Sequence, residues 1–501
     1  MICIHQLILI LLSTFIVVTK CEDPEVTLPY GKIRGVYTKT IRYRKPFYAF
    51  LQVPYAAPPV GKLRFMAPGT NSNLPVLVYI YGGAFIHGSL WFGTLQPQNP
   101  IEKDVIVVLL NYRIGPLGFL STEDDVIQGN MGLKDQLFVL KWVNENIHLF
   151  GGDANKVTLM GQSAGAASVT YHILSPQSKG LFRAAVAESA SALCTWAYQR
   201  NARQTAYGLA VEIDSNFGTN RSSAELLEFL QSVDVSKIDG TADKYKEFAP
   251  VIESLHPDAF ITEPMYETIK TGNINKVPLL IGYCSEEQIF HANDMANWKK
   301  FIEKNYRNPK NLVNQDMNVQ DMATKETIGE QIQNVYTTDS LADEPGKAIQ
   351  FSSDNTYVRP VIRFAELQSW LTDVFLYQFS YHGIIGNNNA TVDGVPGRVA
   401  HAEDVRYFWT YFKNYSEFPE EDVRTVDRYL GLITNFIKYL NPTPEHEEIF
   451  ENILWPKLTS SEMQYLDIDK SLMVKQHPRE FSYQKWVDIY NQYATGTLIT
   501  Y

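Results

Sequence analysis

Short runs of consecutive apolar residues recur along the chain and end abruptly at glycine or polar residues. Five such runs are PVLVYI at 75–80, VIVVLL at 105–110, VTLM at 157–160, VPLLI at 277–281 and VFLYQF at 374–379. A stretch that is apolar at consecutive positions suits a strand that is buried on both faces. The sequence therefore predicts a strand at each of these places.

Between the runs, apolar residues recur at helical spacing. One set steps by three and four after Asn130 and so shares one helix face: Leu133, Leu137, Leu140, Val143 and Ile147. We expect Asn130 to cap the start of this helix and Gly151-Gly152 to stop it.

Strands that alternate with helices predict the α/β class, with a mainly parallel central sheet flanked by helices. Residues from about 300 to 350 are polar and helix-like, and we expect them to form helical insertions on the rim of one domain.

The N-terminus carries an apolar run, LILILLSTFIVV at 7–18, which is too short to span a bilayer comfortably. It fits the core of a signal peptide at 1–21, cut near Cys21, although a membrane anchor or a buried helix is the alternative. No second run of membrane length follows, and the C-terminus has no hydrophobic tail for a lipid anchor. The sequence thus predicts a secreted, extracellular protein with no membrane anchor and a single domain at 22–501.

Composition narrows the possible partners. Apolar residues make up 45% of the chain and charged residues 20%, as in ordinary globular proteins, and the net charge is −11. An acidic balance disfavours nucleic acid and anionic membranes as partners. The four cysteines suggest neither a metal site nor a disulfide scaffold, and Cys194 and Cys284 can pair only if the fold brings them together. Three sequons make Asn220, Asn389 and Asn414 candidate glycosylation sites in a secreted protein.

The first motif that carries chemistry is VTLMGQSAGAAS. A predicted strand runs into Gly161-Gln162-Ser163-Ala164-Gly165 and then into a stretch that can be helical. This is the strand–turn–helix setting of a G-x-S-x-G nucleophile turn, in which small residues allow the serine hydroxyl to stand out toward a substrate. Without that setting, a simple glycine turn would be the better interpretation.

The second motif is YGGAF at 81–85, which follows the strand predicted at 75–80. Consecutive small residues allow the backbone N–H groups of Gly83 and Ala84, together with that of Ala164, to converge on a developing oxyanion. Taken alone, this motif is more typical of a glycine-rich turn between a strand and a helix.

These motifs occur together with several others in a fixed order, and the chain resembles the type-B carboxylesterase/cholinesterase family from about 31 to 486. The pieces that carry the resemblance are VPYAAPPVGKLRF, YIYGGAF, NYRIGPLGFL, GNMGLKDQ, FGGDANKVTLMGQSAGAAS and WPKLTSSEMQYLDI. In Gln162 and in the HAED run at 401–404, the sequence is similar to that of insect esterases of the juvenile-hormone-esterase-like and antennal kinds.

The resemblance implies an α/β-hydrolase fold and a catalytic triad of Ser163, Glu287 and His401. Glu287 follows the predicted strand at 277–281, with Glu286 as the competing residue, and His401 lies in GVPGRVAHAEDVRYFW. The implied reaction is hydrolysis of a small-molecule carboxylic ester through an acyl-enzyme, with no cofactor or metal.

The chain departs from the family pattern between about 68 and 74. The family has several dozen more residues here, which carry a disulfide loop and a sheet strand. Arg64 resembles an arginine whose partner lies in that missing segment, and Phe229 stands where a cysteine is common. A lost strand would leave backbone groups and apolar surface uncovered.

Three functional hypotheses follow. The first is a secreted serine hydrolase that acts on apolar esters. The second is a non-catalytic, cholinesterase-like binding protein, although this chain keeps all three residues of the implied triad. The third is a catalytically impaired splice form, which the missing segment favours. The sequence does not predict which ester is the substrate or what the oligomeric state is.

Overall fold

The computed structural model describes residues 23–29, 31–51, 53, 73–90, 96–242, 247–409, 412 and 414–501. The signal peptide predicted at 1–21, Arg64, and most of the junction at 68–74 lie outside these residues.

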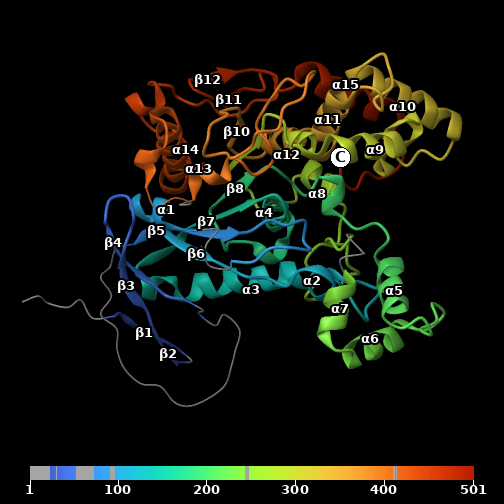
Figure 1. The fold of residues 1–501 in the computed structure, drawn as a ribbon. Helices are drawn as coiled ribbons and strands as arrows, with labels where there is room; N and C mark the ends of the chain where they lie inside the picture. The colour runs from blue at the N-terminus through green and yellow to red at the C-terminus, as the bar shows by residue number, and fades with distance from the viewer. Residues whose placement is uncertain are drawn as a thin grey trace, which may run out of the picture.

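Among the described residues, an eight-stranded sheet forms the centre of the molecule, and helices flank it (Figure 1). Its strands follow the order β12-β11-β10-β9-β8-β7-β5-β6, and every neighbouring pair is parallel except β11 and β12. The bounds are β5 Leu74–Ile80, β6 Ile106–Leu109, β7 Gly152–Gln162, β8 Ala184–Glu188, β9 Leu279–Cys284, β10 Val374–Phe379, β11 Tyr465–Ile468 and β12 Leu472–Lys475. The predicted α/β-hydrolase class, with a mainly parallel sheet, is confirmed.

All five predicted strands are present, but their bounds and burial differ in part from the prediction. β7 begins already at Gly152, and β9 extends to Cys284. The expectation of burial on both faces is wrong for β6, whose four residues are all half-buried. The reason is its place in the sheet, because β6 is the terminal strand of the described sheet and β5 is its one neighbour there.

The helix predicted after Asn130 is α3, Met131–Asn146, which continues as one 3₁₀ turn over Ile147–Phe150. All five residues of the predicted apolar face are buried. Gly151 ends the 3₁₀ turn at φ 83°, a left-handed conformation that favours glycine.

The predicted cap at Asn130 is wrong. Asn130 has a left-handed backbone and its side chain makes no capping bond. Its amide group instead donates to the Val251 carbonyl at 2.8 Å and to Glu253 Oε1 at 2.7 Å, and its Oδ1 accepts the Val251 N–H at 2.9 Å. Asn130 therefore fastens a distant loop to the start of α3.

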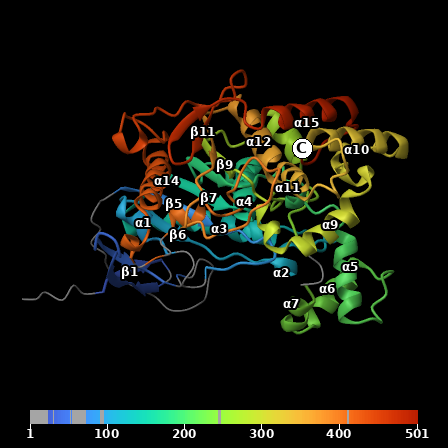
Figure 2. The same ribbon diagram turned by 45° about the horizontal axis from the view of Figure 1, so that its top comes forward.

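The remaining helices pack around the sheet, as Figure 1 and Figure 2 both show. α4 packs against β7 and β8, α12 against β9 and β10, and α14 against β5 and β7. The region from 300 to 350 is helical as predicted, and α5, α6 and α7 project together at one side in both views.

The bounds of these helices are α1 Gln98–Glu102, α2 Gly115–Phe119, α4 Ala164–Leu174, α5 Ala202–Ile213, α6 Ser223–Ser232, α7 Val235–Ala242, α8 Met265–Thr271, α9 Met295–Tyr306, α10 Met322–Tyr336, α11 Pro345–Ser353, α12 Arg359–Ser369, α13 Val405–Phe408, α14 Glu420–Tyr439 and α15 Glu480–Tyr493. Short two-stranded sheets precede β5, formed by β1 Glu25–Leu28 with β2 Gly31–Arg34 and by β3 Val36–Lys39 with β4 Pro46–Ala49.

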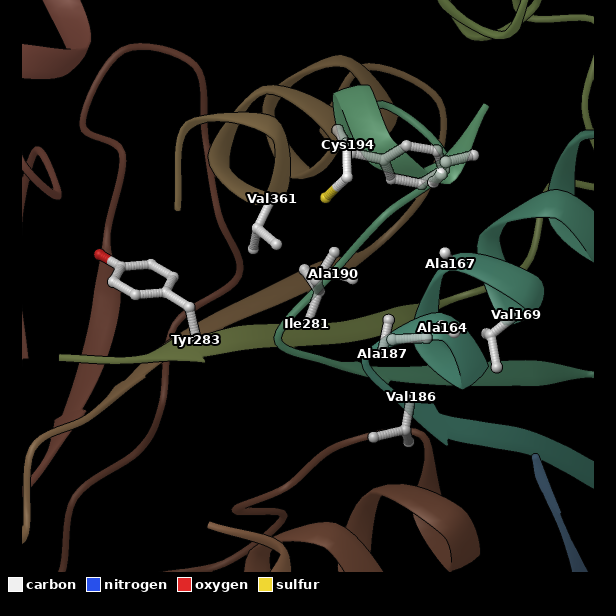
Figure 3. Close-up of a cluster of buried hydrophobic side chains, with 14 of the residues drawn as sticks. Ala164, Ala167, Val169, Val186, Ala187, Ala190, Cys194, Ile281, Tyr283 and Val361 are labelled. Atoms are coloured by element: carbon white, nitrogen blue, oxygen red, sulfur yellow. The ribbon is translucent and has the colours of Figure 1, made fainter. Parts of the chain in front are cut away.

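Small residues allow α4 to lie very close to the sheet. Figure 3 shows Ala164, Ala167 and Ala187 within one buried cluster at this contact. A methyl group added at Gly165 would lie 2.0 Å from the carbonyl oxygen of Ile80, and one added at Gly161 would lie 2.4 Å from the Gly165 backbone. Strand, turn and helix can meet here only because both positions are glycine.

Gly165→Ala should therefore destabilise the fold by about 1–3 kcal/mol or more, because the clash is with main-chain atoms that cannot move aside. Urea unfolding of the purified protein measures this loss. Gly218→Ala is the matched control, since its added methyl group would meet only the end of the Asn220 side chain. Equal midpoints for the two variants would contradict the packing described here.

Candidate active site

Ser163 lies in the turn between β7 and α4 and has an unusual backbone conformation, with φ 56° and ψ −123°. Its N–H donates to the Glu188 carbonyl at the end of β8, at 2.9 Å. The side chain is 8% exposed, and its hydroxyl makes no hydrogen bond with another described residue. Such a strained turn at a fixed position is typical of a functional site.

Glu287 and His401 form a hydrogen-bonded pair beside the Ser163 turn. Glu287 follows β9, His401 lies on the loop that leads to α13, and His401 Nδ1 is 2.6 Å from Glu287 Oε2. The other carboxylate oxygen of Glu287 accepts the Cys284 N–H at 2.7 Å, and the Glu287 carbonyl accepts the His401 N–H at 3.0 Å. Glu287 is fully buried, so these bonds fix its carboxylate and give the histidine proton to Nδ1.

Glu286, the competing residue, faces a different partner. Its carboxylate lies 3.7 Å from Arg479 Nη2. Burial raises the pKa of Glu286 to about 7, partly offset by the Arg479 charge. Of the two glutamates, Glu287 is the one whose carboxylate contacts His401.

The sequence did not predict the partner of the other histidine nitrogen. Nε2 of His401 lies 3.1 Å from the amide nitrogen of Gln162, the residue just before Ser163. With the proton on Nδ1, Nε2 is free to accept this N–H. The Gln162 amide thus occupies the nitrogen that would have to receive a proton from Ser163.

The glycine loop after β5 lies against the serine turn. A methyl group added at Gly82 would come 2.8 Å from Cβ of Ser163, and one at Gly83 would come 2.1 Å from the His87 carbonyl. Gly83 and Ala84 have φ of 125° and 53°, and the Gly83 carbonyl accepts the His87 N–H. The N–H groups of Gly83, Ala84 and Ala164 donate no bond to another described residue, and Ala164 is the first residue of α4.

A cavity of about 510 Å³ opens beside the pair of Gln162 and His401. Its lining includes the aromatic residues Tyr79, Tyr81 and Phe290. Aromatic side chains also pack beside the histidine ring. The ring centroids of Tyr357 and His401 are 4.4 Å apart, and those of Trp196 and Tyr357 are 5.8 Å apart. The site therefore joins the buried Glu287 and the half-buried His401 to a partly aromatic cavity.

The model of one protein family, described as the carboxylesterase family, matches residues 22–73 and 68–486. The chain belongs to the carboxylesterase family. The two matched stretches meet at the junction where the sequence departs from the family pattern.

Several relatives of this carboxylesterase are insect esterases. A juvenile hormone esterase of Tribolium castaneum is 29% identical over 87% of this chain and 86% of its own length. A carboxylic ester hydrolase of Bombus ignitus is 34% identical over 54% of this chain and 57% of that protein. The crystal structure of juvenile hormone esterase from Manduca sexta, with OTFP covalently attached, matches with a TM-score of 0.80 at 26% identity and covers 94% of this chain and 100% of that one. The chain is a carboxylic-ester hydrolase.

The structure bears on three further features noted in the sequence. Cys194 and Cys284 are both buried and unpaired, so the fold does not join them. Phe229, at the position where a cysteine is common, packs 4.7 Å from the ring of Phe217. In the described part of the chain, no helix combines the length and the apolar character that a membrane span requires.

The contact between Gln162 and His401 leads to a test of pH dependence. Gln162→Glu should place a carboxylate beside Nε2 and stabilise the imidazolium, so the acid limb of kcat/KM should move to higher pH by about one unit. A pH profile with a p-nitrophenyl ester measures the limb. Gln162→Met has a similar length but no charge, and because it only removes the N–H that Nε2 accepts, it should move the limb in the same direction by clearly less than Gln162→Glu does. If Gln162→Glu leaves the limb in place, the Gln162 side chain does not face His401 in solution.

Proposed function

We propose that this esterase is a secreted serine hydrolase that cleaves apolar carboxylic esters through an acyl-enzyme on Ser163, with His401 as base and Glu287 as its acidic partner. The observation that carries the proposal is the 2.6 Å contact between His401 Nδ1 and the buried Glu287 carboxylate, next to a serine in a strained turn. Family membership supports the reaction class.

In the proposed mechanism, the Gln162 amide first leaves Nε2 of His401, which then accepts the Ser163 proton. The serine oxygen attacks the ester carbonyl carbon, and the carbonyl electrons move onto its oxygen. Glu287 stabilises the imidazolium that forms. When the intermediate collapses, His401 returns the proton to the departing alcohol. Water then repeats the sequence on the acyl-enzyme and releases the acid.

We assign the stabilisation of the oxyanion to the N–H groups of Gly83, Ala84 and Ala164. These amides are free of other described partners, and the glycine loop lies directly against the Ser163 turn. A donor of this kind contributes about a hundred- to a thousand-fold to the rate, because it is already oriented when charge develops.

Apolar esters are the proposed substrate class. Tyr79, Tyr81 and Phe290 line the cavity beside His401, and Tyr357 packs against the histidine ring. Polar residues such as Asn387, Asn388 and Arg406 line the rest of the cavity, so the aromatic side chains form the part of it that would receive an apolar acyl or alcohol group. Two of the relatives are named for juvenile hormone, which makes that hormone one candidate ester for a direct assay.

Secretion and glycosylation are also proposed. The sequons at Asn220, Asn389 and Asn414 are all exposed, as glycan attachment requires. Asn414 is engaged in its own turn, where its Oδ1 accepts the Ser416 N–H at 3.1 Å.

A catalytically impaired form remains the second candidate, and one observation favours it. The four apolar residues of β6 are half-buried at the end of the described sheet, and the family match falls into two separate stretches that overlap at 68–73. A terminal strand of this kind offers unpaired backbone groups to other chains. A purified chain that is folded but has no ester turnover would favour this form.

Ser163→Ala should lower kcat for a short-chain p-nitrophenyl ester by at least about 10⁴-fold, because no other group can form the acyl-enzyme. Ser168→Ala is the matched control, since Ser168 lies on the same helix and its hydroxyl donates to the Ala164 carbonyl. The control should keep turnover within several-fold of the wild type. Comparable turnover from Ser163→Ala and the wild type would remove Ser163 as the nucleophile.

Expression of the full chain in insect cells should yield protein in the medium whose N-terminus begins near residue 22. An N-glycosidase should lower its mass, and a variant with all three sequon asparagines changed to glutamine should not respond. Protein that stays in the cells with residues 1–21 still attached would contradict the proposed secretion.

A further inference from the structure

Four side chains from different elements form a buried polar cluster behind the acid–base pair. They are Glu188 at the end of β8, Asp404 at the start of α13, Tyr377 of β10 and Tyr429 of α14. Both carboxyl residues are fully buried, and neither tyrosine is more than 1% exposed. The proposed mechanism uses none of them.

The two tyrosine hydroxyls bridge the two carboxyl groups. The Tyr429 hydroxyl lies 2.8 Å from Glu188 Oε1 and 3.3 Å from Asp404 Oδ2. The Tyr377 hydroxyl lies 3.0 Å from the same Asp404 oxygen and 2.9 Å from the Tyr429 hydroxyl. These four close contacts join oxygens only, and the two hydroxyls supply only two hydrogens. A proton on one of the carboxyl groups supplies a third donor, so that three of the four contacts can be hydrogen bonds instead of two.

Burial acts in the same direction. It raises the pKa of Asp404 to about 6, with the nearby Glu287 charge adding to the effect, and it raises the pKa of Glu188 well above its usual range, with Asp404 adding to it. The second oxygen of Glu188 is buried without a hydrogen-bond partner among the described residues. Two ionised carboxylates this close, with so few donors, would cost more than one proton shared between them.

The cluster is tied to both halves of the proposed site. Asp404 lies three residues after His401, and its Oδ1 accepts the Val405 N–H at 3.0 Å. The Glu188 carbonyl accepts the Ser163 N–H at 2.9 Å, so one residue holds both the serine turn and the cluster.

The other titratable groups around the pair are Glu287, His401, Glu403 and Cys284. Glu287 and His401 both act electrostatically on Asp404. Burial raises the pKa of Glu403 to about 7 and that of the Cys284 thiol well above its usual range, so Cys284 stays neutral beside the pair.

We propose that Glu188 and Asp404 share one proton through Tyr429 and together keep a single negative charge behind His401. The pair acts as a positioning device for the base: its charge stabilises the imidazolium that forms when His401 takes the Ser163 proton. When either carboxyl is lost, the other carries the charge. The effect on catalysis rests on the proposed function, whereas the sharing of the proton does not.

The test is a double-mutant cycle read by the pH profile of kcat/KM. Glu188→Gln and Asp404→Asn should each move the acid limb by less than about 0.3 unit, because the remaining carboxyl keeps the charge. The double variant should move the limb to lower pH by about one unit, since the imidazolium loses its nearby negative charge. A full shift in either single variant, or none in the double variant, would overturn the proposal. Asp467→Asn is the control, since this buried carboxylate bonds instead to Ser380 and Lys475 and should leave the limb unmoved.

Infrared spectroscopy tests the shared proton without any turnover and separates this proposal from the proposed function. At pH 8 the wild type should show the carbonyl stretch of a buried protonated carboxyl group. Both single variants should lose this band, because each leaves one ionised carboxylate. Persistence of the band in Asp404→Asn would mean that Glu188 holds the proton alone, and its absence from the wild type would mean that no proton is shared. Either result would overturn the proposal, even for an enzyme that shows no esterase activity.

Discussion

The contact between α4 and β5 is the constraint on which the active site depends. Gly165 brings the first turn of α4 against the carbonyl of Ile80, and no side chain fits between them. This approach forces the chain to reverse direction within one residue, so Ser163 adopts its positive φ. The strained backbone at this position persists because the surrounding packing leaves the turn no other conformation.

Several features of the site follow from that turn. It places the Ala164 N–H, the first of α4, beside the glycine loop, and it directs the Ser163 N–H to the end of β8. It also brings Gln162 toward His401, a residue 239 positions later in the chain. The serine turn, His401 and the cluster of Glu188 and Asp404 are thus parts of one connected arrangement at the carboxyl ends of parallel strands, where ligand sites of α/β folds gather.

Local patterns in the sequence were sufficient for much of the fold. The strands at 75–80 and 374–379 were predicted almost to the residue, because consecutive apolar residues bounded by glycine or polar residues have few other uses. β8 was missed, since its alanine-rich sequence has little strand preference and owes its place to close packing under α4. Asn130 was misjudged because its partners lie more than a hundred residues away, and a local capping rule cannot include them.

In the candidate site, too, local sequence motifs predicted some residues and missed others. Ser163 was identified from its own motif, whereas Glu287 and His401 were identified only from the resemblance to a family, and the structure brings their side chains together. No pattern of sequence spacing predicts the contact of Gln162 with His401 or the proximity of Glu188 to Asp404. Both depend on long-range packing that joins side chains from separate strands and loops.

The central claim is that Ser163 is a nucleophile activated by His401 and Glu287, and covalent labelling tests it most directly. The secreted protein would be treated with a fluorophosphonate, digested, and mapped by mass spectrometry. The account predicts one adduct per chain, on the peptide that contains Ser163, with labelling that slows sharply in His401→Ala. An adduct on another residue, or none on a cooperatively folded protein, would contradict it.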